Sequence, residues 1–268
     1  TGITVELFFV EKGILEKSKN GYYDIMISKN SSEIIAAKDA SLLKTISFEF
    51  LNIIPENYKD NTDGQWFLMS YRIRAFHVKK GLKDIPNTYE DLAKPQYKNR
   101  ICIRNFTHNY NLEMFGSLLS EMGEQKFTEW FKLFKSNLAR DPVGNDRNQV
   151  KGIYDCECDI AIANTYYRGL MLDNPKQKPW ADATEMYIPN QGENSKGVIA
   201  LYAGVGSLSN NKNNQTFFKY LVSDKTQKGL SEHNYEYPIF KKNTSPSVKM
   251  YGKNQGLQYD SIKLYPNI

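Results

Sequence analysis

The stretch from Asp159 to Leu170 constrains the fold most, because an apolar run is followed at once by polar and aromatic residues. Residues 160–163, Ile-Ala-Ile-Ala, are typical of a strand that is buried on both faces of an α/β sheet. Asn164 and Thr165 then interrupt the run, and both are residue types that cap the beginning of a helix. The stretch therefore predicts a strand, a short loop and a helix.

Tyr166 and Tyr167 follow the carboxyl end of this predicted strand, which is where open α/β sheets bind their ligands. Two adjacent tyrosines on the first turn of a helix cannot both point into a core. At least one hydroxyl is therefore expected to reach solvent or a ligand. Tyrosine is common in this chain, 18 of 268 residues, so composition alone favours the alternative that both are packing or surface tyrosines.

Length and composition predict a folded protein of two lobes. The chain has 268 residues, of which 40% are apolar and 13% aromatic. Its net charge of +5 comes from 35 basic and 30 acidic residues, and the lysines are scattered singly, which indicates solubility rather than a nucleic-acid-binding surface. No run approaches the ~18 consecutive apolar residues of a membrane span. We expect neither a nucleic-acid partner nor a membrane span.

The amino terminus, residues 1–7, reads like a strand entered in mid-fold, without an initiator Met or a signal peptide. We expect a mature or trimmed chain, for which a missing signal does not argue against export.

The chain has three cysteines, Cys102, Cys156 and Cys158. Cys156 and Cys158 are too close in sequence for an easy mutual disulfide. A zinc site would need a further Cys or His nearby, and the three histidines show no ligand spacing. Spacing alone leaves two alternatives open: a Cys102–Cys158 disulfide in an oxidising compartment, or free buried thiols.

Predicted strands and helices alternate along the chain, which is typical of α/β architecture. Two long apolar stretches, near residues 72–78 and 198–206, predict strands that cross between two lobes, with a ligand cleft between the lobes. The predicted division is 1–75 for the first part of the amino-terminal lobe, 76–202 for the carboxy-terminal lobe, and 203–268 for the return to the amino-terminal lobe and the tail. Asp146 and Gln149 have the spacing of a capping box.

A second strand–loop–helix unit resembles the opening stretch. The apolar residues 101–103 precede Arg104, a polar loop carries Tyr110, and a helix is predicted from Leu112. If both units belong to one lobe, Arg104, Tyr110 and the Tyr166–Tyr167 pair meet at one wall of the cleft. On spacing alone, Arg104 can also be a surface ion-pair residue and Tyr110 a packing aromatic.

Three phenols beside a guanidinium suit ferric iron. A phenolate is a hard anionic oxygen donor, which hard trivalent iron prefers to thiolate or thioether. Free tyrosine has a pKa of ~10, so it must lose its proton to bind a metal. Arg104 can hold a small oxyanion bidentately and complete the coordination shell.

With these residues, the sequence resembles the ferric-ion-binding proteins of bacterial iron ABC importers, which are periplasmic receptors of the type 2 solute-binding fold. The resemblance runs in consistent order from about Gly2 to Pro238. Five segments carry it: Trp66-Phe67 with Arg72 and Arg74; residues 101–104 with Tyr110-Asn111; Gly144 with Asp146-Arg147 and Gln149; Cys158-Asp159 through Asn164-Thr165-Tyr166-Tyr167; and residues 234–238, Asn-Tyr-Glu-Tyr-Pro.

The resemblance implies a site. It assigns Tyr110, Tyr166 and Tyr167 as Fe³⁺ ligands, and it puts Arg104 and Asn164 around them or on a bound anion such as carbonate. It also implies a disulfide between Cys102 and Cys158, which fits an exported protein, and leaves Cys156 as an extra thiol.

Two departures from the family pattern affect this prediction. The family has a further strand and helix ahead of residue 1, with a His or Tyr ligand of the amino-terminal lobe, so the fourth protein ligand is not assigned. The 197–204 stretch lacks the His and Asn that the family often shows there. His108 is a candidate extra ligand, although a loop histidine is more often merely solvated.

We therefore predict an α/β protein with the two-lobed type 2 periplasmic-binding-protein fold. It captures Fe³⁺ by hinge closure and delivers it to an inner-membrane ABC permease. We expect it to be periplasmic, monomeric and not an enzyme.

Three alternatives stay open. The first is a receptor for an oxyanion or small organic anion held by Arg104 and helix N-termini. The second is an enzyme with Cys156 or Cys158 as nucleophile, for which the sequence places no base, and the third is a truncated piece that has lost its metal affinity.

Overall fold

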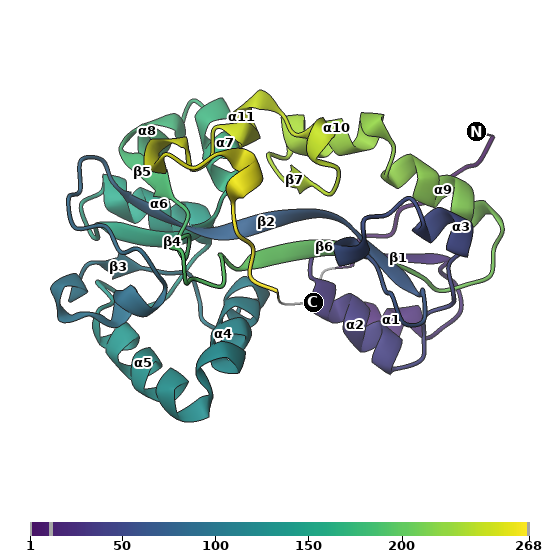
Figure 1. Cartoon of the computed structure of the whole chain (residues 1–268), viewed down its shortest axis with the longest axis horizontal. Helices are drawn as coiled ribbons and strands as arrows, with labels where there is room; N and C mark the ends of the chain where they lie inside the picture. Colours follow the sequence, from purple (N-terminus) through teal and green to yellow (C-terminus); the bar gives the residue numbers. More distant parts are fainter. Residues whose placement is uncertain (1, 11–12, 267–268) are drawn as a thin grey trace. The chain divides into compact units, whose positions relative to one another are not determined.

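The computed structural model describes residues 2–10 and 13–266, which divide into two compact units. Unit 1 contains the described residues of Thr1–Tyr71, Leu201–Ser231 and Tyr237–Thr244, and unit 2 contains those of Arg72–Ala200, Glu232–Glu236 and Ser245–Ile268. Two strands, β2 (Trp66–Lys79) and β6 (Ala200–Ser207), run from one unit into the other (Figure 1). The predicted α/β fold with two crossing strands is confirmed.

Unit 1 is an antiparallel sheet with helices packed on it. Strand β1 pairs with β6, and β7 pairs with the first part of β2. Its core includes Phe50, Phe67 and Phe218, whose ring centroids lie 5.0 to 5.6 Å apart. Besides β2 and β6, its elements are α1 (Ile14–Ser18), β1 (Ile25–Ser28), α2 (Ser31–Asp39), α3 (Phe48–Leu51), η1 (Glu56–Tyr58), α9 (Asn213–Leu221), α10 (Asp224–His233), β7 (Tyr237–Pro238) and η4 (Lys241–Asn243).

Unit 2 holds most of the helices that the structure describes. In chain order its elements after β2 are η2 (Glu90–Ala93), η3 (Pro95–Tyr97), β3 (Ile101–Cys102), α4 (Asn109–Met122), α5 (Glu124–Ser136), α6 (Asp146–Tyr154), β4 (Ile160–Asn164), α7 (Tyr166–Asp173), α8 (Lys178–Asp182), β5 (Thr184–Tyr187), α11 (Pro246–Lys249), η5 (Lys253–Gln255) and η6 (Tyr259–Ser261).

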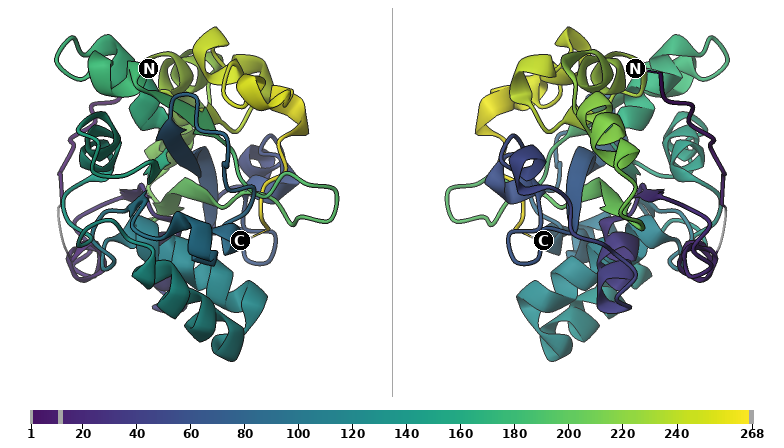
Figure 2. Two further views of the ribbon diagram at one scale, coloured as in Figure 1. Left: turned by 90° about the vertical axis from the view of Figure 1, so that its left-hand side faces the viewer. Right: turned by 90° about the vertical axis from the view of Figure 1, so that its right-hand side faces the viewer.

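In unit 2, the described strands β3 and β4 form a parallel pair, and this pair positions the candidate site. Strand β4 pairs antiparallel with β2 and parallel with β3, while β5 pairs with the other edge of β2. All five residues of β4 are buried, because helices cover both faces of the sheet. Figures 1 and 2 show α6, α7 and α8 on one side of this sheet and the paired helices α4 and α5 on the other.

Several element predictions need correction. Residues 2–7 of the predicted amino-terminal strand form no strand: none of them pairs with a neighbour, and their side chains are mostly exposed, as Leu7 is at 67%. Residue 1, which the same prediction includes, lies outside the described residues. Helix α4 begins at Asn109 rather than Leu112, because His108 caps it. The predicted capping box of Asp146 and Gln149 is wrong, since Asn145 and Asn148 form it.

The carboxy-terminal segment differs from the expected return to the amino-terminal lobe. Its described residues from Ser245 onward pack in unit 2. The reason is a backbone pairing with Val198: the Val198 N–H donates to the Lys263 carbonyl at 2.9 Å, and the Tyr265 N–H donates to the Val198 carbonyl at 2.8 Å.

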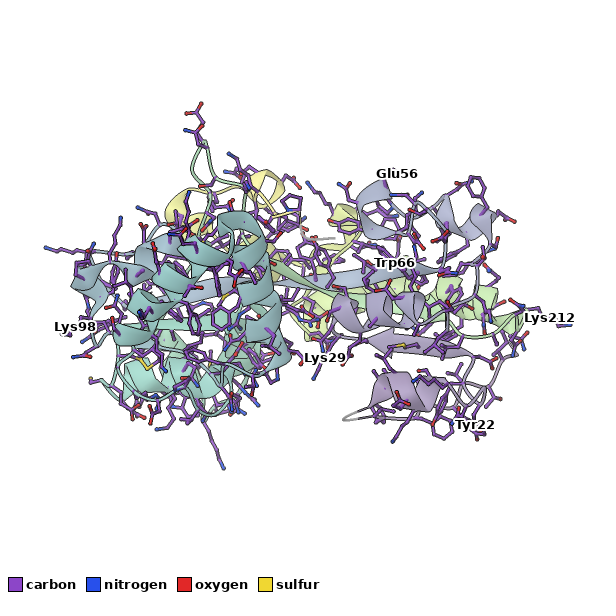
Figure 3. All side chains as sticks on the ribbon, turned by 90° about the horizontal axis from the view of Figure 1, so that it is seen from below. Tyr22, Lys29, Glu56, Trp66, Lys98 and Lys212 are labelled. Atoms are coloured by element: carbon purple, nitrogen blue, oxygen red, sulfur yellow. A yellow bond between two sulfur atoms is a disulfide. The ribbon has the colours of Figure 1, made fainter. Side chains whose placement is uncertain are left out.

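Charged side chains are scattered over the surfaces of both units. Lys98 in unit 2 and Lys212 in unit 1 are exposed, and both are labelled in Figure 3. In the described part of the chain, no helix combines the length and apolar character needed to cross a membrane.

His77 on β2 gives the first testable consequence of the fold. Its side chain is 0% exposed, and neither ring nitrogen has a hydrogen-bond partner among the described residues. Burial, together with the charges of Arg168 and Arg74, lowers the pKa of His77 from 6.5 to about 3. The unfolded chain therefore binds this proton at a higher pH than the native protein does.

We expect the full contribution to stability above pH 6.5, and a loss of about 1.4 kcal/mol per pH unit as the pH falls from there toward 3. Urea unfolding at pH 8, 6 and 5 measures this slope, and His77→Phe should flatten it. The exposed His233 supplies the control His233→Gln, which should keep the wild-type slope. Equal slopes for wild type and His77→Phe would contradict the prediction.

Candidate functional site

The parallel pairing of β3 with β4 brings two loops to one edge of the sheet. Ile101 is in register with Ile160, and Cys102 with Ala161, so both strands end on the same side. The chain after β3 leads through Arg104 into α4, and the chain after β4 leads directly into α7. Polar side chains from both segments therefore collect at the carboxyl edge of the strands.

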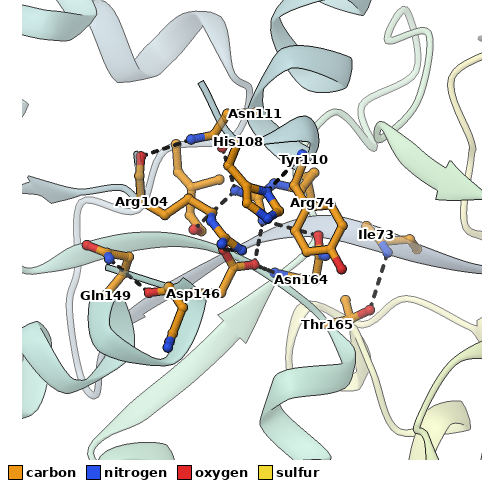
Figure 4. Close-up of polar contacts among 12 residues, drawn as sticks. Ile73, Arg74, Arg104, His108, Tyr110, Asn111, Asp146, Gln149, Asn164 and Thr165 are labelled. Carbon is orange, nitrogen blue, oxygen red and sulfur yellow. Dashed lines mark hydrogen bonds and ion pairs between the residues drawn. The ribbon is translucent and has the colours of Figure 1, made fainter. Parts of the chain in front are cut away.

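Tyr110 lies on the first turn of α4, not on a free loop as predicted. The His108 Nδ1 accepts a hydrogen bond from the Tyr110 backbone N–H at 3.2 Å and thereby caps the helix. The His108 ring lies edge-on to the Tyr110 ring, with centroids 4.6 Å apart (Figure 4). Capping engages Nδ1 of His108, and the role of this histidine as an extra ligand stays a prediction.

The three tyrosines meet. The Tyr166 side chain lies within interaction range of those of Tyr110 and Tyr167, and the rings of Tyr166 and Tyr167 lie 4.1 Å apart. Tyr110 is buried, and the other two are half-buried. Burial, followed by the charges of the neighbouring phenols, raises the pKa of Tyr166, and burial followed by the Asp146 charge raises the pKa of Tyr167. Three phenol side chains from two segments thus interact at one partly buried position.

Arg104 lies beside these phenols. Its guanidinium carbon is 5.3 Å from the Tyr110 ring centroid, and its Nη1 contacts the Asp146 carboxylate at 3.2 Å. The side chain is largely buried, and its Nε has no hydrogen-bond partner among the described residues. Arg72 approaches the Tyr110 ring as well, at 5.2 Å.

Asn164 does not face the phenols with a free amide oxygen. Its Oδ1 accepts a hydrogen bond from Arg74 at 3.1 Å, and its backbone N–H donates to Asp146 at 2.8 Å. Sequence reasoning assigned no role in the site to Arg74, Asp146 and Asn111, which form this buried polar network (Figure 4). A signal was present: Arg72 and Arg74 alternate within a strand that is otherwise mostly apolar, and a buried strand tolerates charge only where the charge is paired.

The cysteines resolve into one disulfide and one thiol. Cys102 and Cys158 are joined by a disulfide, the pairing that the family resemblance implies. Cys158 therefore offers no thiol for the alternative of an enzymatic nucleophile, and Cys156 is exposed and free. The disulfide packs with Ile153 and Ala161 in an apolar cluster.

Clusters of the commoner metal ligands are absent from residues 2–10 and 13–266: no group of three or more His, Cys, Asp or Glu side chains is placed to hold a metal ion. The tyrosine hydroxyls of the candidate site are a different kind of metal ligand from these four residue types.

A family model described as bacterial extracellular solute-binding protein matches residues 20–263. Iron uptake protein A1 of Synechocystis sp. is 33% identical over 252 residues, which are 89% of this chain and 69% of that protein.

Solved structures agree over most of the chain. The apo ferric ion-binding protein A of Pasteurella haemolytica matches with a TM-score of 0.85 and 33% identity, covering 98% of this chain and 84% of that one. A Trichodesmium protein in complex with iron and citrate ligands matches with a TM-score of 0.82 and 31% identity, covering 93% of this chain and 81% of that one.

Proposed function

The chain belongs to the bacterial extracellular solute-binding protein family, and from this membership we propose that it is the Fe³⁺ receptor of an ABC importer. Its fold is that of the type 2 periplasmic binding proteins, as in the ferric-binding proteins it resembles. Receptors of this kind bind a solute outside the inner membrane and deliver it to a permease, without chemical turnover. The periplasm is the compartment we propose, and the disulfide is consistent with it.

The observation that carries the proposal is the meeting of Tyr110, Tyr166 and Tyr167. Their side chains interact at the carboxyl edge of the sheet of unit 2, where the rings of Tyr166 and Tyr167 lie 4.1 Å apart. Three phenolates supply three hard negative charges, which match trivalent iron better than any divalent metal that prefers imidazole or thiolate. Each phenol must lose its proton to coordinate, so Fe³⁺ replaces protons at this position.

An anion completes the site in our proposal, held by Arg104. The buried Asp146 carboxylate contacts both Arg74 and Arg104, so one negative charge faces two guanidinium groups. The Arg104 Nε has no hydrogen-bond partner among the described residues, which supports a contact with an oxyanion such as carbonate or a carboxylate. The Trichodesmium relative that binds iron together with citrate supports the same arrangement.

The test is a visible absorption titration with ferric citrate. Wild-type protein is expected to develop a phenolate-to-iron charge-transfer band that saturates. Tyr166→Phe/Tyr167→Phe should lose the band and bind Fe³⁺ at least ~100-fold more weakly, because two of three phenolates are gone. Tyr154→Phe is the matched control, since Tyr154 is an exposed tyrosine of the same unit, and it should leave the band unchanged.

Two outcomes would contradict the proposal. A folded wild-type protein that stays colourless does not coordinate iron through phenolate. If instead the double variant binds Fe³⁺ as tightly as the wild type does, the phenols do not coordinate the ion. The alternative function, an anion receptor that uses Arg104, is then favoured.

A further inference from the structure

Arg74 is the centre of a buried polar network behind the phenols. It lies on β2 within unit 2 and is 0% exposed. Its Nη1 donates to the Asp146 carboxylate at 2.6 Å and to the Asn164 Oδ1 at 3.1 Å, and its Nη2 donates to the Asn111 Oδ1 at 2.8 Å (Figure 4). These three partners belong to α6, β4 and α4. One guanidinium therefore connects three separate elements.

Asp146 is the second residue with several contacts in this network. Besides Arg74, its carboxylate accepts the Asn164 backbone N–H at 2.8 Å and Arg104 Nη1 at 3.2 Å. The carboxylate is 0% exposed, so each of these contacts is shielded from water. Asn111 adds a further link, since its Nδ2 donates to the Arg104 carbonyl at 3.0 Å.

The network reaches both phenol-bearing segments through neighbouring residues. Asn111 directly follows Tyr110 in the chain, and Asn164 precedes Tyr166 by two residues. Fixing the two asparagines therefore fixes the backbone of α4 and α7 at the points from which the phenols project. Metal coordination depends on this precision, because ligands that are even 1 Å out of place bind the ion much more weakly.

We infer that the Arg74–Asp146 pair positions the three phenols, so that the ligand geometry exists before Fe³⁺ arrives. The inference rests on the proposed function and adds to it which residues determine affinity without touching the ion. A buried ion pair is weak evidence for stability, because apolar residues of similar volume often replace one without loss. Its contacts here lead to the ligand segments, which points to a role in ligand geometry. The partners that orient metal ligands usually change affinity when they are removed.

The test compares two ion pairs of unit 2. Asp146→Asn keeps the shape of the side chain but removes its charge, and it should weaken Fe³⁺ binding about tenfold or more, as measured by competition with citrate. The charge-transfer band should also shift or broaden, a change that lower stability alone does not produce. Arg100→Gln is the control: Arg100 pairs with Asp84 and with Asp159 just before β4, away from the phenols. It should lower the melting temperature but leave affinity and band unchanged.

A second variant keeps the test decisive if Asp146→Asn does not fold. Asn111→Ala leaves the Arg74–Asp146 ion pair in place but removes its link to α4, and it should weaken Fe³⁺ binding severalfold with a similar band change. Wild-type affinity and band in the folded network variants would overturn the inference while the proposed function stands. An equal loss of affinity in Arg100→Gln would overturn it as well. A colourless wild-type protein would overturn the proposed function and this inference with it.

Discussion

Replacing Gly169 by alanine is expected to destabilise the protein by about 4 kcal/mol, above the ~1–3 kcal/mol usual for overpacking. Gly169 lies on α7, and a Cβ there would overlap three atoms of the Tyr235 ring. That ring is 9% exposed, and its hydroxyl is hydrogen-bonded to Asp173 on the same helix. Alanine would therefore force out the ring and break the hydrogen bond together.

Urea unfolding at 25 °C measures this effect. Gly116→Ala is the matched control, because Gly116 is also helical, on α4, and a Cβ there meets nothing within 4 Å. It should stabilise slightly, by up to ~1 kcal/mol, through helix propensity. In a Tyr235→Ala background, Gly169→Ala should cost little, since the ring it overlaps is gone. Full destabilisation in that background would show that the ring is not the cause.

Removing the disulfide is expected to have an effect of similar size. Cys102 and Cys158 are 56 residues apart in sequence, and closing a loop of that length restricts the unfolded chain by about 4 kcal/mol in the chain-entropy model. Cys102→Ala/Cys158→Ala should lose most of this free energy of unfolding. Because both sulfurs are buried, packing loss adds to the effect.

The measurement is urea unfolding with and without a reducing agent. Reduction should destabilise the wild type and leave the double variant unchanged. Cys156→Ser should keep nearly wild-type stability, since Cys156 is exposed and outside the disulfide. The native wild type should also show one thiol that reacts with a thiol reagent. Equal stability of wild type and double variant would refute the loop-entropy argument.

Local sequence pattern predicted the part of the site that depends on neighbouring residues. The apolar run 160–163 became β4, and the helix carrying Tyr166 and Tyr167 begins directly after it. This succeeded because an apolar run of strand length followed by polar residues has few alternatives in an α/β protein. The start of α4 was missed because a histidine cap is not among the common N-cap types.

The family resemblance indicated which residues belong to the site, but it did not indicate how their side chains interact. Asp146 illustrates the difference. Its spacing to Gln149 predicts that it caps its own helix. In the structure its side chain is fully buried and contacts Arg74 and Arg104, which are 72 and 42 residues away in sequence. No local pattern encodes such a contact, because the partner of a buried charge is determined by which strands lie side by side.

By itself the sequence determined the alternation of strands and helices and the position of three tyrosines at strand ends, since both follow from hydrophobic period and residue type. Only the tertiary structure decided that the three hydroxyls meet, that Asn164 faces Arg74, and that Cys102 joins Cys158. The physical reason is the parallel register of β3 with β4. It brings segments about 60 residues apart to one edge of the sheet, and pairing between distant strands is a property of the packed core rather than of any single stretch.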